Sequence, residues 1–376
     1  MLKSGSKRVV YIYSNELLRL SDKNPAITGR ASLFHDLIKS YELLNFMSIK
    51  RPKICTESDL RNFHSEDYLV YLKEKSSTSA EELEEESLCN EFGFDCPVWP
   101  GIYEYCLSIA GSTLAAVEEE VCNGADIVLN WFGGWHHADG DKAAGYCYVN
   151  DIVLGILKLR QNFERIMYID LDVHHGDGVE RAFEATKRVF TLSFHQHESG
   201  FYPGTGTVED CGFGVAKGFS ANFPYKSGIS GNSFKKYFQR IFANIFERHQ
   251  PKVFIVQCGG DVISGDPLGG ANIVPEDIKS CLEDVFSKNI PTILLGGGGY
   301  NFSNTARFWT NLTGMVCGIE LDNDIPDNNE HFLSFGPDYQ LQISRKIIGD
   351  LNDEKYLEQT CSLIEDNLEK FNVGAV

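Results

Sequence analysis

Short apolar runs alternate with longer helical stretches along most of the chain, and this alternation constrains the fold more than any other feature. The runs are rich in β-branched or aromatic residues and lie at residues 9–13, 127–130, 166–169, 189–194, 253–256 and 293–295. Short buried strands separated by helices are typical of a parallel sheet covered on both faces. We therefore predict a single α/β domain with a mostly parallel central sheet and helices on both of its faces.

Amphipathic spacing and capping residues mark several helices. We predict them at residues 30–44, from Ser65 to about residue 75, at residues 102–120 and at about residues 353–371. The acidic segment 76–91 has no apolar period and is expected to form a surface loop. The sequence has neither an internal repeat nor a linker, so one domain over residues 1–376 is the simplest organisation.

The charge balance argues against some classes of partner. A formal net charge of −19 disfavours direct binding to duplex nucleic acid, which relies on Lys and Arg at the phosphates, and instead favours a basic ligand. No apolar run reaches the roughly 18 residues that span a bilayer. The start of the chain has no signal-peptide pattern, so we expect the protein in the nucleus or the cytoplasm and not at a membrane.

The eleven cysteines are irregularly spaced and include no Cys-x-x-Cys pair, so a structural zinc ribbon is not expected. Cys106, Cys122, Cys258 and Cys281 lie in apolar stretches. We interpret them as core thiols in a reducing compartment.

Polar clusters begin at the end of four predicted strands, at Asn130, Asp170, Gln257 and Gly296. In a parallel sheet the carboxyl ends of the strands share one edge, where ligands bind. We therefore expect these four segments to meet in one pocket.

Acidic residues and a histidine in two of these clusters suggest a metal site. Asp170, Asp172 and His174 alternate, so an extended strand would point all three in the same direction. Buried carboxylates need a compensating cation, and Asp172 and His174 with Asp261 would form a three-ligand site with open positions, as catalytic Zn²⁺ requires. Fe²⁺ or Co²⁺ also suits these ligands, and a metal-free polar network is the alternative.

Two further features suit hydrolysis. His136 and His137 follow a Gly-Gly-Trp segment, and Asp170 and Asp177 are available to orient them as acid–base groups. Four glycines precede Tyr300, and no Gly-Lys-Ser/Thr follows them, which excludes a phosphate-binding P-loop. Either the turn presents the Tyr300 phenol to a developing oxyanion, or it is an ordinary turn with a core tyrosine.

Together these segments closely resemble the zinc-dependent histone deacetylases, class I in particular. The resemblance runs from Val9 to about Tyr339, with its strongest motifs at residues 133–138, 168–180, 201–206 and 295–301. It implies an arginase/deacetylase-like fold. It also implies hydrolysis of N6-acetyl-lysine in proteins such as histone tails, with release of acetate. The implied role is transcriptional repression together with corepressor proteins. In the family's mechanism zinc polarises the acetyl carbonyl, His137 takes a proton from the attacking water, and a histidine protonates the leaving amine.

The resemblance also assigns roles to individual residues. It implies zinc at Asp172, His174 and Asp261, the pairs His136–Asp170 and His137–Asp177, and Tyr300 as the carbonyl-polarising group. It implies substrate contacts at Asp95, Gly145, Tyr146, Tyr202 and Leu268, and an acetate exit beside Arg30. Two K⁺ sites are implied, one at Asp170, Asp172, His174 and Ser193, and one at Phe183, Thr186, Val189 and Phe219.

The sequence departs from the family pattern at a few positions. Tyr146 and Tyr202 stand where phenylalanines usually line the acyl-lysine tunnel, and Asp139 and Gly140 replace two frequent lysines. Gly260 replaces the usual Ala or Ser before Asp261, which predicts a looser ligand loop. These changes bear on acyl preference and leave every catalytic group in place.

Three other functions are compatible with parts of this pattern. An acetylpolyamine deacetylase on the same fold would also take a cationic substrate, but it resembles the chain less around Asp95 and after Gly145. A two-manganese, arginase-like ureohydrolase needs an Asp-x-His-x-Asp strand motif, whereas this chain has Asp170-x-Asp172-x-His174. An inactive corepressor scaffold would have lost a ligand or Tyr300, and neither is missing.

Overall fold

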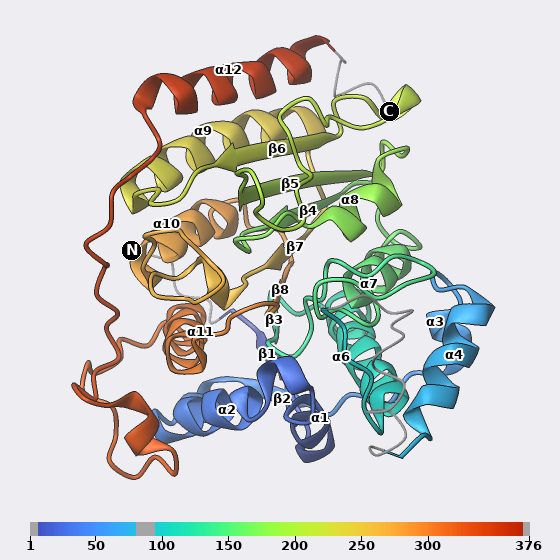
Figure 1. Ribbon diagram of the computed structural model, residues 1–376, viewed down its shortest axis with the longest axis vertical. Helices are drawn as coiled ribbons and strands as arrows, with labels where there is room; N and C mark the ends of the chain where they lie inside the picture. Colours follow the sequence, from blue (N-terminus) through green and yellow to red (C-terminus); the bar gives the residue numbers. More distant parts are fainter. Residues whose placement is uncertain (1–6, 80–94, 371–376) are drawn as a thin grey trace.

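The computed structural model describes residues 7–79 and 95–370, with the side chains of residues 121 and 122 left out. Its described part contains one eight-stranded sheet, in which every neighbouring pair is parallel (Figure 1). In spatial order the strands are β2 (Ser48–Lys50), β1 (Val9–Ile12), β3 (Ile127–Asn130), β8 (Thr292–Leu295), β7 (Val253–Gln257), β4 (Ile166–Asp170), β5 (Val189–Gln196) and β6 (Ser220–Tyr225). The predicted α/β class with a parallel sheet is confirmed.

Helices cover both faces of this sheet, as predicted. One face carries α6, α7 and α8, and the other carries α2, α11, α10 and α9 (Figure 1). The helix α12 packs on α9 and β6, while α3 and α4 lie outside α6. The helices are α1 (Asn15–Ser21), α2 (Arg30–Ser40), α3 (Glu57–Leu60), α4 (Glu66–Ser76), α6 (Ile102–Asn123), α7 (Asp151–Leu159), α8 (Asp177–Phe183), α9 (Gly231–His249), α10 (Pro275–Phe286), α11 (Phe302–Cys317) and α12 (Glu354–Lys370). Short 3-10 turns are η1 (Pro25–Ile27), η2 (Leu43–Phe46), η4 (Gly214–Ala216), η5 (Gly260–Val262) and η6 (Phe332–Phe335).

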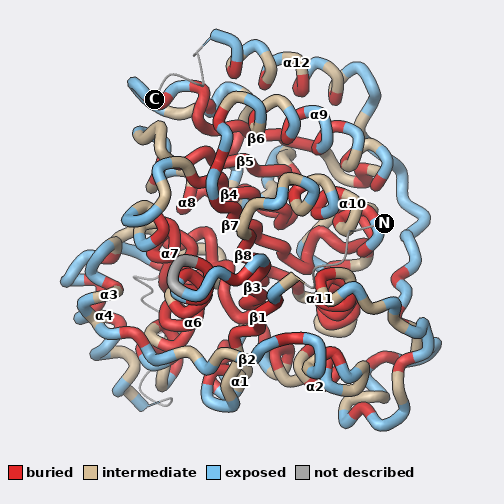
Figure 2. Tube along the Cα trace, turned by 180° about the vertical axis from the view of Figure 1, so that it is seen from behind, coloured by how far each residue is buried: buried red, intermediate tan, exposed pale blue. Residues whose placement is uncertain are grey.

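The central strands are buried along their whole length, which explains why their sequences are continuously apolar rather than alternating (Figure 2). Their register aligns the carboxyl ends. Asp170 pairs with Ser193 on one side and with Gln257 on the other, and Leu295 pairs with Gln257 and Asn130. The four polar clusters therefore start from one edge of the sheet.

The predicted helix at residues 30–44 is too long. The helix α2 ends at Ser40, and Glu42 has a left-handed backbone with φ of 57° before η2 begins. The apolar spacing continues to residue 44 because Leu43 still packs in the core after the helix has ended. The spacing therefore predicted a longer helix than the structure has.

Two edge strands were not predicted. The strand β2 is short and carries an exposed Ile49, so its sequence lacks a buried face. The strand β6 contains Asn222 and Pro224, which weaken a strand pattern but are tolerated at a sheet edge.

The helices expected at residues 102–120 and 353–371 are α6 and α12, and Phe371 lies outside the described residues. Of the expected loop 76–91, Ser76 ends α4 and residues 80–91 are not described. Cys106, Cys258 and Cys281 are buried free thiols, while nothing is described for the side chain of Cys122. Within the described ranges, no helix has the length and apolar character needed to cross a membrane.

Candidate active site

Asp172, His174 and Asp261 lie together in the interior, with one ligand atom of each within 4.8 Å of the others. The Nδ1 atom of His174 is 3.2 Å from Asp172 Oδ1 and 3.3 Å from Asp261 Oδ2. All three side chains are buried. The predicted ligands thus converge, although they come from the ends of two different strands.

The charges of this trio call for a cation. Burial and the neighbouring Asp172 raise the pKa of the Asp261 carboxyl to about 7. Burial disfavours the charged form of His174, but Asp172 and Asp261 outweigh it and raise the pKa of His174 to about 10. The buried Asp261 Oδ2 makes no hydrogen bond within the described part of the chain. Two desolvated carboxylates with a spare acceptor fit a divalent metal, since such a cation would take the place of the proton that they hold on His174.

The loop after β4 is bent rather than extended. The strand ends at Asp170, and each acidic side chain then accepts the backbone N–H two residues later: Asp172 N donates to Asp170 Oδ1 (3.1 Å) and His174 N donates to Asp172 Oδ1 (3.0 Å). Such turns of Asp onto its own backbone are a local preference of this residue. The strand does not stay extended through His174, so the alternation of side chains along a strand does not account for this arrangement.

Glycines are required where the ligand loops touch. A Cβ on Gly298 would collide with the Asp261 carboxylate, and one on Gly297 with the Gln257 amide. Gly297 and Gly299 also have φ of 123° and 126°, which side chains rarely adopt. Within the four-glycine run, Gly298 is therefore the point where the backbone closely approaches the Asp261 and Asp172 carboxylates.

Gly260 does not loosen the ligand loop as the sequence suggested. A Cβ on Gly260 would collide with Thr305 of α11, and the Gly260 N–H donates to Gly298 O at 2.8 Å. The space that Ala or Ser would need is filled by Thr305, so the loop is tightly packed.

His136 and His137 each meet the carboxylate that was predicted. His136 Nδ1 is 2.8 Å from Asp170 Oδ2, and His137 Nδ1 is 2.7 Å from Asp177 Oδ1. Their rings lie 3.9 Å apart between centroids. Both imidazoles therefore have Nδ1 occupied and leave Nε2 for other chemistry.

The environments of the two histidines drive their pKa values in opposite directions. Burial opposes the charged form of His136, but Asp170 and Asp172 overcome it and raise the pKa of His136 to about 9. Burial together with the neighbouring His136 lowers the pKa of His137 to about 3. The carboxylates around His136 thus favour its charged form, whereas burial and a charged His136 favour the neutral form of His137.

Tyr300 faces the same small cavity, of about 10 Å³, as both histidines and the metal trio. Burial, followed by Asp261 and Asp172, raises the pKa of the Tyr300 phenol well above its usual value. The phenol therefore keeps its proton and can donate it in a hydrogen bond. Arg30 lies behind this turn, where its guanidinium donates to Gly297 O and Gly299 O, both at 2.9 Å.

Of the residues predicted to contact substrate, Gly145 lines this cavity, and two tyrosines lie beside residues that line it. The Tyr202 ring is 5.0 Å from the His137 ring, and the Tyr146 ring is 5.5 Å from the Tyr300 ring. Gly145 donates its N–H to Asp95 Oδ2 at 2.6 Å. Tyr202 and Leu268 are 39% and 40% exposed, so both still reach solvent.

The residues expected to bind K⁺ lie around β5. Asp170 and Ser193 are register partners, and the Ser193 hydroxyl is 2.9 Å from His195 Nδ1. In the second set, Thr186 N donates to Phe183 O (3.0 Å), while Phe219 O accepts from the N–H of Thr191 (3.1 Å). Val189 starts the strand itself.

Two site residues had no predicted role. Asp151 is buried and accepts from the N–H groups of Gly134 (3.0 Å) and Trp135 (2.8 Å), which fixes the segment leading to His136. Gln257 donates from Nε2 to Asp172 Oδ2 at 2.7 Å. Gln257 opens one of the four polar clusters that the sequence places at strand ends, whereas no sequence pattern sets Asp151 apart from other acids at helix starts.

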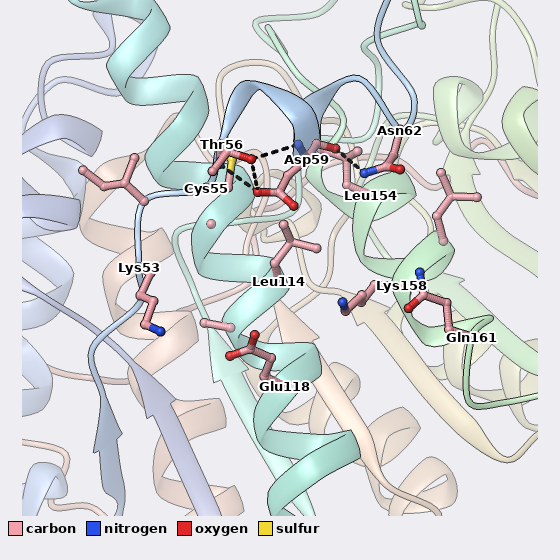
Figure 3. Close-up of a pocket in the computed structure, with 14 residues that line it drawn as sticks. Lys53, Cys55, Thr56, Asp59, Asn62, Leu114, Glu118, Leu154, Lys158 and Gln161 are labelled. Atoms are coloured by element: carbon pink, nitrogen blue, oxygen red, sulfur yellow. Dashed lines mark hydrogen bonds between the residues drawn. The ribbon is translucent and has the colours of Figure 1, made fainter.

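A larger cavity of about 310 Å³ lies elsewhere, between residues 53–62, α6 and α7 (Figure 3). Lys53, Glu118 and Lys158 stand around it, and no predicted site residue lines it. The chemistry is therefore expected at the strand edge rather than in this cavity.

Comparisons with known proteins agree with this geometry. A family profile described as "Histone deacetylase domain" matches residues 24–316. Histone deacetylase 8 of Danio rerio is 41% identical over 366 residues, which cover 97% of this chain and 96% of that protein. Histone deacetylase RPD3 of Saccharomyces cerevisiae is 38% identical over 368 residues, covering 97% of this chain and 84% of that protein. Histone deacetylase HDAC1 of Drosophila melanogaster is 37% identical over 370 residues, covering 98% and 71%.

Proposed function

Because the chain belongs to the histone deacetylase family and is a hydrolase acting on acetyl-lysine, we propose that it deacetylates N6-acetyl-lysine in histone tails with zinc as its metal. The observation that carries the proposal is the buried trio Asp172, His174 and Asp261, with its spare carboxylate oxygen, facing one cavity with two histidines and Tyr300. A single divalent cation with nitrogen and oxygen ligands suits this trio, and the open positions suit catalysis.

When bound, zinc supplies a Lewis acid for the acetyl carbonyl and a lowered pKa for water. His137 is neutral and oriented by Asp177, so its free Nε2 can take the proton of the attacking water. Asp170 and Asp172 favour the protonated form of His136, which makes it the candidate donor to the leaving lysine amine.

Tyr300 donates its phenolic proton in a hydrogen bond to the oxyanion that develops on the acetyl carbonyl. We propose that the Tyr146 and Tyr202 rings flank the lysine stem. Asp95 lies at the rim, where it holds the Gly145 N–H and faces the backbone of the substrate. Leu268 adds an apolar contact at the mouth.

Further assignments follow from family membership and belong to the same proposal. Residues 1–376 form one catalytic domain. Arg30 lies on the acetate exit, and K⁺ binds at the two sets around β5. The enzyme acts in the nucleus on acetylated chromatin proteins, beside corepressor proteins.

Parallel assays of the zinc-loaded protein on an acetylated histone-tail peptide and on acetylspermidine test the substrate class. We expect kcat/KM to be at least tenfold higher for the peptide, because the rim residues contact a peptide backbone that the polyamine lacks. A higher kcat/KM for acetylspermidine would transfer the assignment to polyamine deacetylation.

A further inference from the structure

Asp266 is a buried acid just beyond η5 that belongs to neither the metal trio nor the histidine pairs. Its Oδ2 atom accepts the backbone N–H groups of Tyr300 (2.7 Å) and Asn301 (2.9 Å). Its Oδ1 atom accepts the backbone N–H of Leu268 at 2.9 Å. One carboxylate thus holds the backbone of the oxyanion tyrosine and of a residue at the mouth.

The Tyr300 turn needs such an anchor. It follows four glycines, which restrict the backbone least of all residues, and it ends at the N-terminus of α11. An acid at a helix N-terminus is favoured by the exposed N–H groups and the helix dipole. Asp266 therefore stabilises this turn in a position that the glycines alone would not fix.

The same contact links the Tyr300 turn to the loop that follows β7 and carries Asp261. Asp266 lies five positions after Asp261 in the sequence, and its N–H donates to Ile263 O at 3.1 Å. Asn301 Nδ2 donates to Gly265 O at 3.3 Å, and Asn304 Nδ2 donates to Ser264 O at 3.2 Å. These bonds fix the position of the Tyr300 turn relative to the segment that carries Asp261.

We propose that Asp266 is a positioning residue of the deacetylation reaction, which fixes Tyr300 relative to the metal-binding loop. The proposal rests on the oxyanion role of Tyr300. It assigns Asp266 no contact with substrate or metal, and the effect on kcat is attributed to the bond with the Tyr300 N–H rather than to the bond with the Leu268 N–H.

A double-mutant cycle tests this. We expect Asp266→Ala to lower kcat by roughly 10- to 100-fold, because displacing a reacting group by about 1 Å has an effect of this size. KM and zinc content should change less than twofold. In the Tyr300→Phe background, Asp266→Ala should lower kcat less than twofold further, since the phenol that it positions is gone.

Conservative and control variants separate positioning from general damage. Asp266→Asn keeps a carbonyl acceptor and should recover at least part of the lost kcat, and it replaces the alanine variant where that variant does not fold. Asp277 is a matched control, because it is also a buried acid that accepts a backbone N–H, that of Val274 at the start of α10. Asp277→Ala should leave kcat unchanged.

Each contrary outcome is distinct. Multiplicative losses in the double mutant, or loss of zinc from Asp266→Ala, would overturn the positioning role. Full activity of Tyr300→Phe alone would instead overturn the proposed oxyanion role of Tyr300.

Discussion

Tyr300 is a half-buried residue whose phenol is desolvated and lies near two carboxylates, and both features raise the pKa of the phenol. At the scale of single residues the site depends on such fixed protonation states. The pKa of His136 is raised and that of His137 is lowered, although each has one carboxylate partner, because a positive charge on His136 disfavours a second one beside it. The different environments of His136 and His137 thus suit them to different roles, acid for His136 and base for His137.

Replacing Tyr300 with Phe removes only the phenolic oxygen. We expect kcat to fall by about 10²- to 10³-fold, the usual effect of losing one oxyanion donor. Zinc content, measured by mass spectrometry of the metal, should match the wild type. Turnover within a factor of three of the wild type would rule out the oxyanion role.

The tunnel hydroxyls are expected to tune acyl preference without carrying catalysis. In the Tyr146→Phe, Tyr202→Phe double variant the rings keep their stacking surface, so turnover of acetyl-lysine should stay within about threefold. The ratio of kcat/KM for crotonyl-lysine to that for acetyl-lysine should change. An identical ratio in both proteins would show that these hydroxyls do not affect selection.

At the scale of elements, the site is assembled from strand ends and from glycine turns that let them approach. The Gly298 backbone lies against Asp261, so Gly298→Ala should displace that carboxylate and weaken zinc binding by about 10- to 100-fold, as changes next to a ligand do. Titration with a fluorescent zinc chelator measures this. Gly349→Ala is the control, because a Cβ there meets nothing within 4 Å. Equal zinc affinity in both variants would contradict the close-approach argument.

Sequence patterns predicted that the site residues converge. They did not predict which other residues hold the backbone of the site in place. Asp172, His174 and Asp261 could be placed at one edge because parallel strands must align their carboxyl ends. Asp151 and Asp266 could not be assigned roles, since each acts on backbone N–H groups whose positions depend on loop geometry. The strand β6 was missed for a related reason: at a sheet edge Pro224 is tolerated because its missing N–H faces no partner.

At the scale of the whole molecule, a metal bound only by the folded chain should stabilise the fold. The trio draws on two loops that follow separate strands, so the unfolded chain cannot hold the metal in the same way. Free zinc at 100 times its Kd would add about 2.7 kcal/mol to the free energy of unfolding. Thermal melts with zinc and with a chelator should therefore differ by a few degrees in Tm, and equal values would contradict a site formed by folding.

The most direct test of the account is acetate release from an acetyl-lysine peptide by zinc-loaded enzyme, chelator-stripped enzyme and the Asp261→Ala variant, measured side by side. We predict release by the zinc-loaded enzyme, loss on stripping, recovery when zinc is added back, and no recovery in the variant. Acetate release that is unaffected by stripping, or zinc-restored activity in Asp261→Ala, would contradict a reaction centred on Asp172, His174 and Asp261.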